Sequence, residues 1–107
     1  MKVIAFNGSA RKDGNTAILL NHVLKELQIE GIDTELFQLA SKEIHGCRAC
    51  YKCIENKDNH CSLDNDILNP CVDKMLDADG IILGSPTYFT DVSTEMKALI
   101  DRAGLVS

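Results

Sequence analysis

Short apolar runs along the chain mark three candidate strands. Residues 2–6 and 80–84 are almost continuously apolar, which is typical of strands buried on both faces. Residues 34–39 instead alternate polar and apolar side chains, as a strand with one exposed face does. The chain therefore predicts two inner strands and one outer strand.

Helical spacing of apolar residues follows each of these strands. It covers residues 15–30, residues 67–76 and the segment after Ser93. We expect Gly31 to end the first of these helices and Ser93 to cap the start of the last one. The side chains expected on the sheet-facing sides are Ala17, Leu20, Val23, Leu24, Leu27, Met96, Leu99 and Ile100. Strand and helix alternate three times, which predicts right-handed crossovers over a parallel sheet and an α/β doubly wound fold.

The run Ile81 to Leu83 is apolar on both faces, which predicts a strand with neighbouring strands on both sides. Three strands leave one of its edges open. We therefore expect a further part of the sheet to be missing from this chain or to be supplied by another chain.

Composition narrows the possible partners. The 107 residues (11.8 kDa) suit one domain spanning 1–107, and the net charge of −5 gives no basic surface for nucleic acid. Residues 1–53 carry seven basic and six acidic groups, whereas residues 54–107 carry four and ten, so an anion should prefer the first half. The longest apolar runs are far below the roughly 20 residues that span a bilayer, and no signal-peptide pattern precedes the first strand. These features predict a cytoplasmic protein without a membrane partner.

Residues 8–16 connect the first strand to the first helix, where a parallel sheet places its ligand crevice. Amides at a helix start attract anions, and Ser9, Asn15, Thr16 and either Arg11 or Lys12 add donors, so a phosphate monoester fits this loop. The loop is neither a nucleoside triphosphate P-loop nor a G-x-G-x-x-G fingerprint. The alternative is an ordinary capped turn.

Residues 84–93 follow the third strand. In strand order 2-1-3 the first and third strands are neighbours, so this loop borders the same crevice as residues 8–16. Pro86 shapes the turn, and Tyr88 and Phe89 stand where a flat ring would lie. The alternative is that both aromatic rings pack under the rim of the sheet.

The segments GSARKDGNT and ADGIILGSPTYFTDVSTEMKALIDRAG resemble the NADPH-dependent FMN reductases of the flavodoxin-like superfamily. The resemblance implies that the first loop holds the phosphate of FMN and that the second holds its isoalloxazine ring. It implies phosphate ligands at Ser9, Arg11, Asn15 and Thr16, and flavin contacts at Pro86, Thr87, Tyr88 and Phe89. Members of that family continue through two more strand and helix units, so strands 4 and 5 of a flavodoxin-like sheet are absent from this chain.

Four cysteines lie within the loop 41–64, which has no sustained period. Cys47, Cys50, Cys53 and Cys61 place four thiols in fifteen positions, which suits a [4Fe-4S] cluster or tetrahedral zinc. The arrangement resembles that of the iron-sulfur flavoproteins, a branch of the same family whose cysteine motif carries a [4Fe-4S] cluster. Structural or regulatory thiols are the alternative.

The cysteine loop leaves the carboxyl end of the second strand, on the rim of the expected flavin site. It would then cover that site or reach a partner subunit. We expect Cys71 to be a buried small hydrophobe, and His45 and His60 to be solvated loop residues.

The leading interpretation is an FMN-dependent oxidoreductase that takes hydride from NAD(P)H and passes electrons to a quinone, a flavin or another small acceptor. No side chain is required as a nucleophile, and no G-x-S-x-G elbow is present. One alternative is an iron-sulfur flavoprotein that carries electrons between FMN and a protein. Another is a non-enzymatic zinc-binding module. The resemblance also implies a homo-oligomer.

Overall fold

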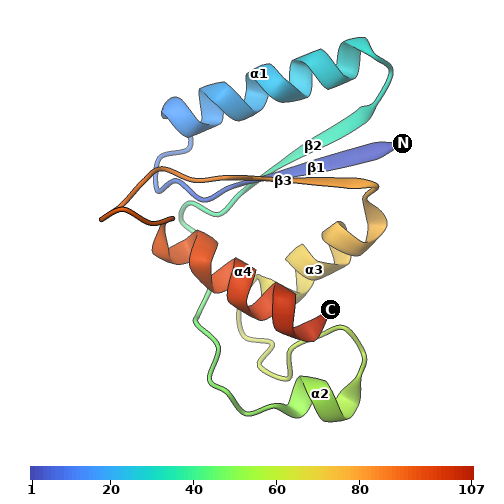
Figure 1. Ribbon diagram of the computed structural model, residues 1–107, viewed down its shortest axis with the longest axis vertical. Helices are drawn as coiled ribbons and strands as arrows, with labels where there is room; N and C mark the ends of the chain where they lie inside the picture. The colour runs from blue at the N-terminus through green and yellow to red at the C-terminus, as the bar shows by residue number, and fades with distance from the viewer.

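The computed structural model describes residues 1–107 and contains one three-stranded parallel sheet. Its strands are β1 (Lys2–Asn7), β2 (Asp33–Gln38) and β3 (Gly80–Gly84), in the order β2-β1-β3 (Figure 1). The central strand β1 pairs with both neighbours in parallel. The expected flavodoxin-like order 2-1-3 is thus confirmed.

Helices cover both faces of this sheet. α1 (Asn15–Ile29) lies on one face, while α3 (Leu68–Asp77) and α4 (Thr94–Val106) lie on the other, with the short α2 (Lys52–Asn56) beyond them (Figure 1). All strands end on the side where α1 and α4 begin. The doubly wound arrangement therefore leaves a rim of loops at the carboxyl ends of the strands.

The core consists of one cluster on each face of β1. Ile4 and Phe6 are fully buried against α3 and α4, whereas Val3 and Ala5 face α1, because successive side chains of a strand point to opposite faces. The larger cluster contains Ile4, Phe6, Leu39, Leu68, Cys71, Val72, Met96, Leu99 and Val106. The smaller cluster contains Val3, Ala5, Leu20 and Leu24.

Local signals place the end of α1 and the start of α4 where the sequence predicts. Gly31 takes a left-handed φ of +81°, and the amides of Gly31 and Ile32 donate to the carbonyls of Gln28 and Leu27, which is a Schellman cap. At α4, the Ser93 hydroxyl accepts from the Met96 amide, so Ser93 caps this helix as expected.

Three details differ from the sequence interpretation. The segment 40–63 contains the helix α2, whose five residues are too few for a sustained period. Val23 is largely exposed instead of facing the sheet. Ile100, at the margin of the buried face of α4, is also partly exposed.

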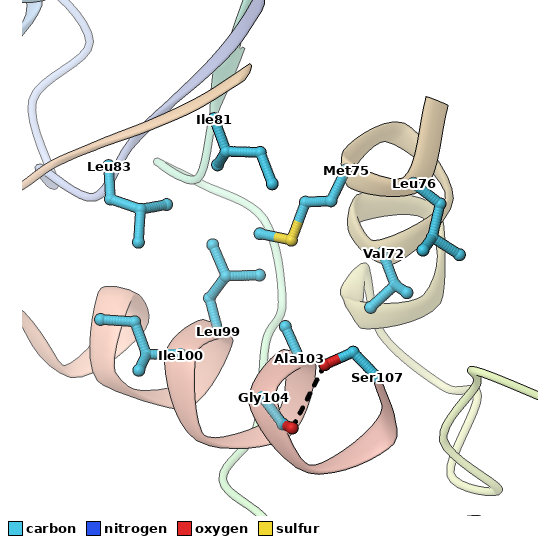
Figure 2. A pocket seen from close by; sticks show the side chains of 10 residues that line it. All are labelled: Val72, Met75, Leu76, Ile81, Leu83, Leu99, Ile100, Ala103, Gly104 and Ser107. Carbon is cyan, nitrogen blue, oxygen red and sulfur yellow. Dashed lines mark hydrogen bonds between the residues drawn. The ribbon is translucent and has the colours of Figure 1, made fainter. Parts of the chain in front are cut away.

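The open edge of β3 is observed. Ile81 and Leu83 are 47% and 45% exposed, and both face an apolar groove of about 320 Å³ between β3, α3 and α4 (Figure 2). The groove is lined by Val72, Met75, Leu76, Ile81, Leu83, Leu99, Ile100, Ala103, Gly104 and Ser107. β3 therefore lacks a neighbour on one side, as its sequence predicts.

A buried ion pair attaches the cysteine loop to α4. The Arg102 guanidinium donates to an Asp66 carboxylate oxygen at 2.5 Å, and both side chains are at most 1% exposed. Arg102 also donates to the carbonyls of His45 and Leu63, and Asp66 accepts from the amides of His45 and Leu68. This pair therefore holds both ends of the segment 45–66.

Burial alone would raise the pKa of Asp66, but hydrogen bonds from Arg102 and from the amides of His45 and Leu68 outweigh it, so the pKa lies below its usual value of 3.8. A lowered pKa in the folded state means that the ionised carboxylate stabilises the fold.

We expect Asp66→Asn to lower the free energy of unfolding by about 3–5 kcal/mol, because Arg102 would keep a buried charge without its partner. Urea unfolding followed by circular dichroism measures this. Asp101→Asn is the matched control: Asp101 pairs with Lys97 on the exposed side of α4, so its loss should leave the free energy of unfolding nearly unchanged. Equal effects of the two substitutions would contradict the structural role of the pair.

The same pair predicts an acid-sensitive contribution to stability. The contribution of Asp66 is fully present above its unfolded pKa near 3.8 and is lost as pH falls through the lower folded pKa. Wild-type stability should therefore fall more steeply below pH 3.8 than that of a folded Asp66→Asn variant, measured by urea unfolding across the acid range. Parallel curves would be inconsistent with a lowered pKa at Asp66.

Candidate functional site

The loops after β1 and β3 line one cleft at the carboxyl rim of the sheet. The cleft has a volume of about 500 Å³ and is lined by Ser9, Arg11, Asp13, Gly14, Asn15, Thr16, Pro86 and Tyr88. Six of the eight predicted cofactor-binding residues are among them. Thr87 and Phe89 are not.

The start of α1 forms one side of the cleft and is equipped for an anion. Gly14 occupies the N-cap position, so no side chain caps the helix, and no acidic residue lies in its first turn. Within the first turn the positive end of the helix dipole is therefore unopposed, although the Asp13 carboxylate, just before the N-cap, lines the same cleft. Arg11 and Lys12 stand beside it with no carboxylate partner.

Ser9 is placed to donate into the cleft. Its amide donates to Asn7 Oδ1 at 3.0 Å, and its hydroxyl oxygen accepts from the Arg11 amide at 3.1 Å. Because the oxygen accepts there, the hydroxyl proton remains available to a ligand. Among the charged groups, Asp13 adds a carboxylate that the sequence interpretation did not assign to the site.

Two polar side chains at the strand ends support this loop from below. Asn7 is fully buried, and its Nδ2 donates to Gln38 Oε1 at 2.9 Å; Gln38 Nε2 in turn donates to the Lys12 carbonyl at 3.2 Å. The sequence interpretation missed both residues. A polar residue closing an otherwise apolar run is a signal that would have found Asn7.

The other side of the cleft is a tight turn at Tyr88–Asp91. The Tyr88 amide donates to the Asp91 carbonyl at 2.8 Å and the Asp91 amide returns a bond at 3.1 Å, while Phe89 and Thr90 both have positive φ. Positive φ at both central residues is the pattern of a type I′ turn, which glycine and asparagine prefer. Phe89 is 100% exposed and Tyr88 is about half exposed, so neither ring is packed under the rim of the sheet.

Gly8 allows α4 to approach the first loop closely. A Cβ at position 8 would lie 2.9 Å from Cβ of Met96, closer than real Cβ atoms come to one another. Glycine is therefore required here by packing, since any side chain would push α4 away from the loop.

The cysteine loop does not cover this cleft. None of the residues 41–64 lines the cleft, and the loop runs instead along the far side of α4 (Figure 1). Of the two expectations for this loop, covering the site is therefore wrong, and contact with a partner subunit stays a prediction. The loop starts on the rim as predicted. Its path away from the rim is fixed by Arg102, near the opposite end of α4, which donates to the carbonyls of His45 and Leu63.

All four predicted metal ligands line a second, small hollow. Cys47, Cys50, Cys53 and Cys61 share it with Arg102 at the end of α4. No three metal-binding side chains of the chain are close enough in this arrangement to hold an ion together. The donor set of four thiols on one hollow fits a thiophilic centre, whereas their present spacing is wider than such a centre needs.

The cysteines differ in their surroundings. A hydrogen bond from the Lys52 amide, aided by Ser62, lowers the pKa of the exposed Cys50 thiol. Burial raises the pKa of Cys71 to about 12, which confirms Cys71 as a buried hydrophobe.

The two histidines of the loop also differ. His60 Nε2 lies 2.6 Å from Asp73 Oδ1, and this bond raises the pKa of the imidazole, so His60 is paired where a solvated residue was expected. His45 is exposed, as expected.

An ordered parallel sheet of order 2-1-3, with an uncapped helix start and an aromatic turn on one cleft of its carboxyl rim, defines a flavodoxin-like α/β domain. The family model described as NADPH-dependent FMN reductase matches residues 1–106. The chain belongs to this family.

Individual relatives agree. The chain is 45% identical over 103 residues to an iron-sulfur flavoprotein of Methanocaldococcus jannaschii, covering 96% of this chain and 52% of the relative. It is 39% identical over 103 residues to an iron-sulfur flavoprotein of Archaeoglobus fulgidus, covering 96% and 49%. The chain thus spans about half the length of the curated relatives it matches.

A solved structure shares the fold. An apo form of an NADH:FMN oxidoreductase superposes with a TM-score of 0.67 at 22% identity, covering 94% of this chain and 49% of that one. In the present structure no helix has the length and apolar character needed to cross a bilayer.

We expect Gly8→Ala to lower the free energy of unfolding by about 1–3 kcal/mol, because its Cβ would overlap Met96. Thermal or urea unfolding measures the change. Gly104→Ala is the control: its Cβ would meet nothing within 4 Å, and alanine in a helix should raise stability by up to about 1 kcal/mol. A neutral Gly8→Ala would mean that α4 does not approach the loop so closely.

Proposed function

We propose that the chain binds FMN in the rim cleft and contributes this site to an NAD(P)H-dependent oxidoreductase. The observation that carries the proposal is that the uncapped start of α1 and the Tyr88 turn line the same cleft. Family membership supports the proposal as well.

The phosphate of FMN would lie against residues 9–16. Amides at the start of α1 would donate to its oxygens together with Ser9, Asn15 and Thr16, and Arg11 would supply a full positive charge. Arg11 is the cation assigned to this role because it lines the cleft, whereas Lys12 does not.

The isoalloxazine ring would lie against residues 86–89. Pro86 and Tyr88 line the cleft. Thr87 and Phe89 would act through their amides, which donate to no acceptor within the protein. Hydrogen bonds from such amides to a flavin ring tune its electronics.

Bound FMN would supply the hydride and electron chemistry. The tasks of this chain are then to bind the phosphate, to orient the ring and to restrict water at the rim. No side chain needs to act as a nucleophile. We propose NAD(P)H as the donor, a quinone, flavin or other small molecule as the acceptor, a cytoplasmic location, and a homo-oligomer as the working form.

Arg11→Ala should weaken FMN binding about tenfold to a hundredfold, because a charge-assisted contact to phosphate contributes about 1.5–3 kcal/mol. Titration of flavin fluorescence measures the dissociation constant. Riboflavin, which has no phosphate, should bind wild type and Arg11→Ala equally. Unchanged FMN affinity in the variant would remove Arg11 from the site.

Lys25→Ala is the matched control for charge. Lys25 is an exposed cation on α1, ten residues beyond the start of the helix. Its removal changes the net charge by the same amount but should leave the affinity for FMN unchanged. A loss equal to that of Arg11→Ala would indicate a general electrostatic effect and not a phosphate contact.

A second proposal concerns the cysteine hollow. We infer that Cys47, Cys50, Cys53 and Cys61 hold a [4Fe-4S] cluster, because four thiols line one hollow and because the relatives named above are iron-sulfur flavoproteins. Tetrahedral zinc on the same four thiols is the alternative. Either centre requires the loop 47–61 to contract around it.

Anaerobically prepared protein should contain iron and acid-labile sulfide, and Cys50→Ser should lower both by at least half. Cys71→Ser is the control, because Cys71 is buried within the core and does not line the hollow, and it should keep the wild-type content. Stoichiometric zinc without sulfide would favour the alternative centre. Protein with neither would contradict both.

A further inference from the structure

We propose that Ser93 is a positioning residue that fixes the first loop of the cleft relative to the aromatic turn. A ligand that contacts both the loop and the turn then binds more tightly than it would if the two could move independently. This proposal rests on FMN as the ligand of the cleft. It concerns a buried side chain that does not line the cleft itself.

Ser93 is fully buried and bonds to three separate segments. Its hydroxyl donates to the Gly8 carbonyl at 2.6 Å and accepts from the Met96 amide at 3.2 Å. Its amide donates to Ser85 Oγ at 2.8 Å, and that hydroxyl donates to the Pro86 carbonyl at 2.9 Å. One residue thus joins the first loop, α4 and the start of the loop that carries the aromatic turn.

Helix capping explains only part of this arrangement. A cap needs an oxygen that accepts from the first turn, and the Met96 bond provides that. The hydroxyl proton is used elsewhere, on a carbonyl 85 residues away in the sequence. Threonine, which has an oxygen and a proton in the same place, is the only other common residue that serves both partners in this way.

Both backbone polar groups of Gly8 are hydrogen-bonded to the second loop of the cleft. Its amide donates to the Gly84 carbonyl at 2.8 Å, and its carbonyl accepts from Ser93. Gly84 and Ser93 flank the loop that carries Pro86 and Tyr88. The first residue of the phosphate loop is therefore held by the two ends of the loop that would carry the ring.

This connection has a consequence for a ligand with two recognised ends. When both ends are held at a fixed separation, the second contact forms without further ordering of the protein, which increases affinity. A ligand that contacts only the aromatic turn gains nothing from the connection. FMN has both ends, whereas riboflavin lacks the phosphate.

The test compares FMN and riboflavin binding in Ser93→Ala and Ser93→Thr. Ser93→Ala removes the hydroxyl bonds to Gly8 and to the Met96 amide, but keeps the amide bond to Ser85 that closes the loop carrying the aromatic turn. We expect its affinity for FMN to fall about tenfold while its affinity for riboflavin changes less than twofold. Ser93→Thr should restore the affinity for FMN to within about threefold of wild type.

Two further variants separate coupling from helix stability. Glu95→Gln removes the acidic residue from the first turn of α4 without touching either loop, and should change neither affinity. Ser85→Ala removes the support of the aromatic turn and should weaken FMN and riboflavin alike. An equal loss of both ligands in Ser93→Ala would show a structural role only, and would overturn the proposal.

A readout without flavin completes the test. Amide NMR of flavin-free protein should show shifted resonances for residues 8–16 in Ser93→Ala and unshifted ones in Glu95→Gln. Unshifted resonances in Ser93→Ala would overturn the coupling even if FMN binds. Shifted resonances together with no flavin binding by the wild type would instead overturn the proposed function.

Discussion

The buried pair of Arg102 with Asp66 is the interaction on which one whole side of the molecule depends. The segment 45–66 has little core of its own, because its only helix has five residues, none of them buried. In place of apolar packing, hydrogen bonds from Arg102 to two backbone carbonyls and one carboxylate hold this segment against α4. Two opposite charges taken out of water remain favourable here because nearly every polar atom has a partner, only Arg102 Nε lacking one.

The same helix serves both functional regions. Ser93 at the start of α4 bonds to the loops of the rim cleft, and Arg102, nine residues further on, organises the cysteine hollow. At 1.5 Å per residue these positions are about 14 Å apart along the helix axis. The helix between them therefore sets the spacing between the rim cleft and the cysteine hollow.

How much the sequence predicts depends on where each signal lies along the chain. The strands, the Gly31 stop and the Ser93 cap follow from local patterns, and the order 2-1-3 follows from the doubly wound, flavodoxin-like class. Six cleft residues follow because parallel strands end on one rim. The path of the cysteine loop has no such signal, since Arg102 contacts it from 36 to 57 residues away. The turn that carries the exposed Phe89 is local but was not predicted, because Phe89 and Thr90 have positive φ angles that aromatic and β-branched residues seldom adopt.

The open side of β3 affects the solubility of this chain. Unpaired backbone groups beside Ile81 and Leu83 form a template on which another strand adds readily, and the neighbouring groove is apolar. Self-association at high concentration would begin along that edge, which runs beside the rim that carries the cleft. Ile81→Lys would therefore improve solubility, because it places a charge on the exposed edge of β3 and changes no residue of the cleft.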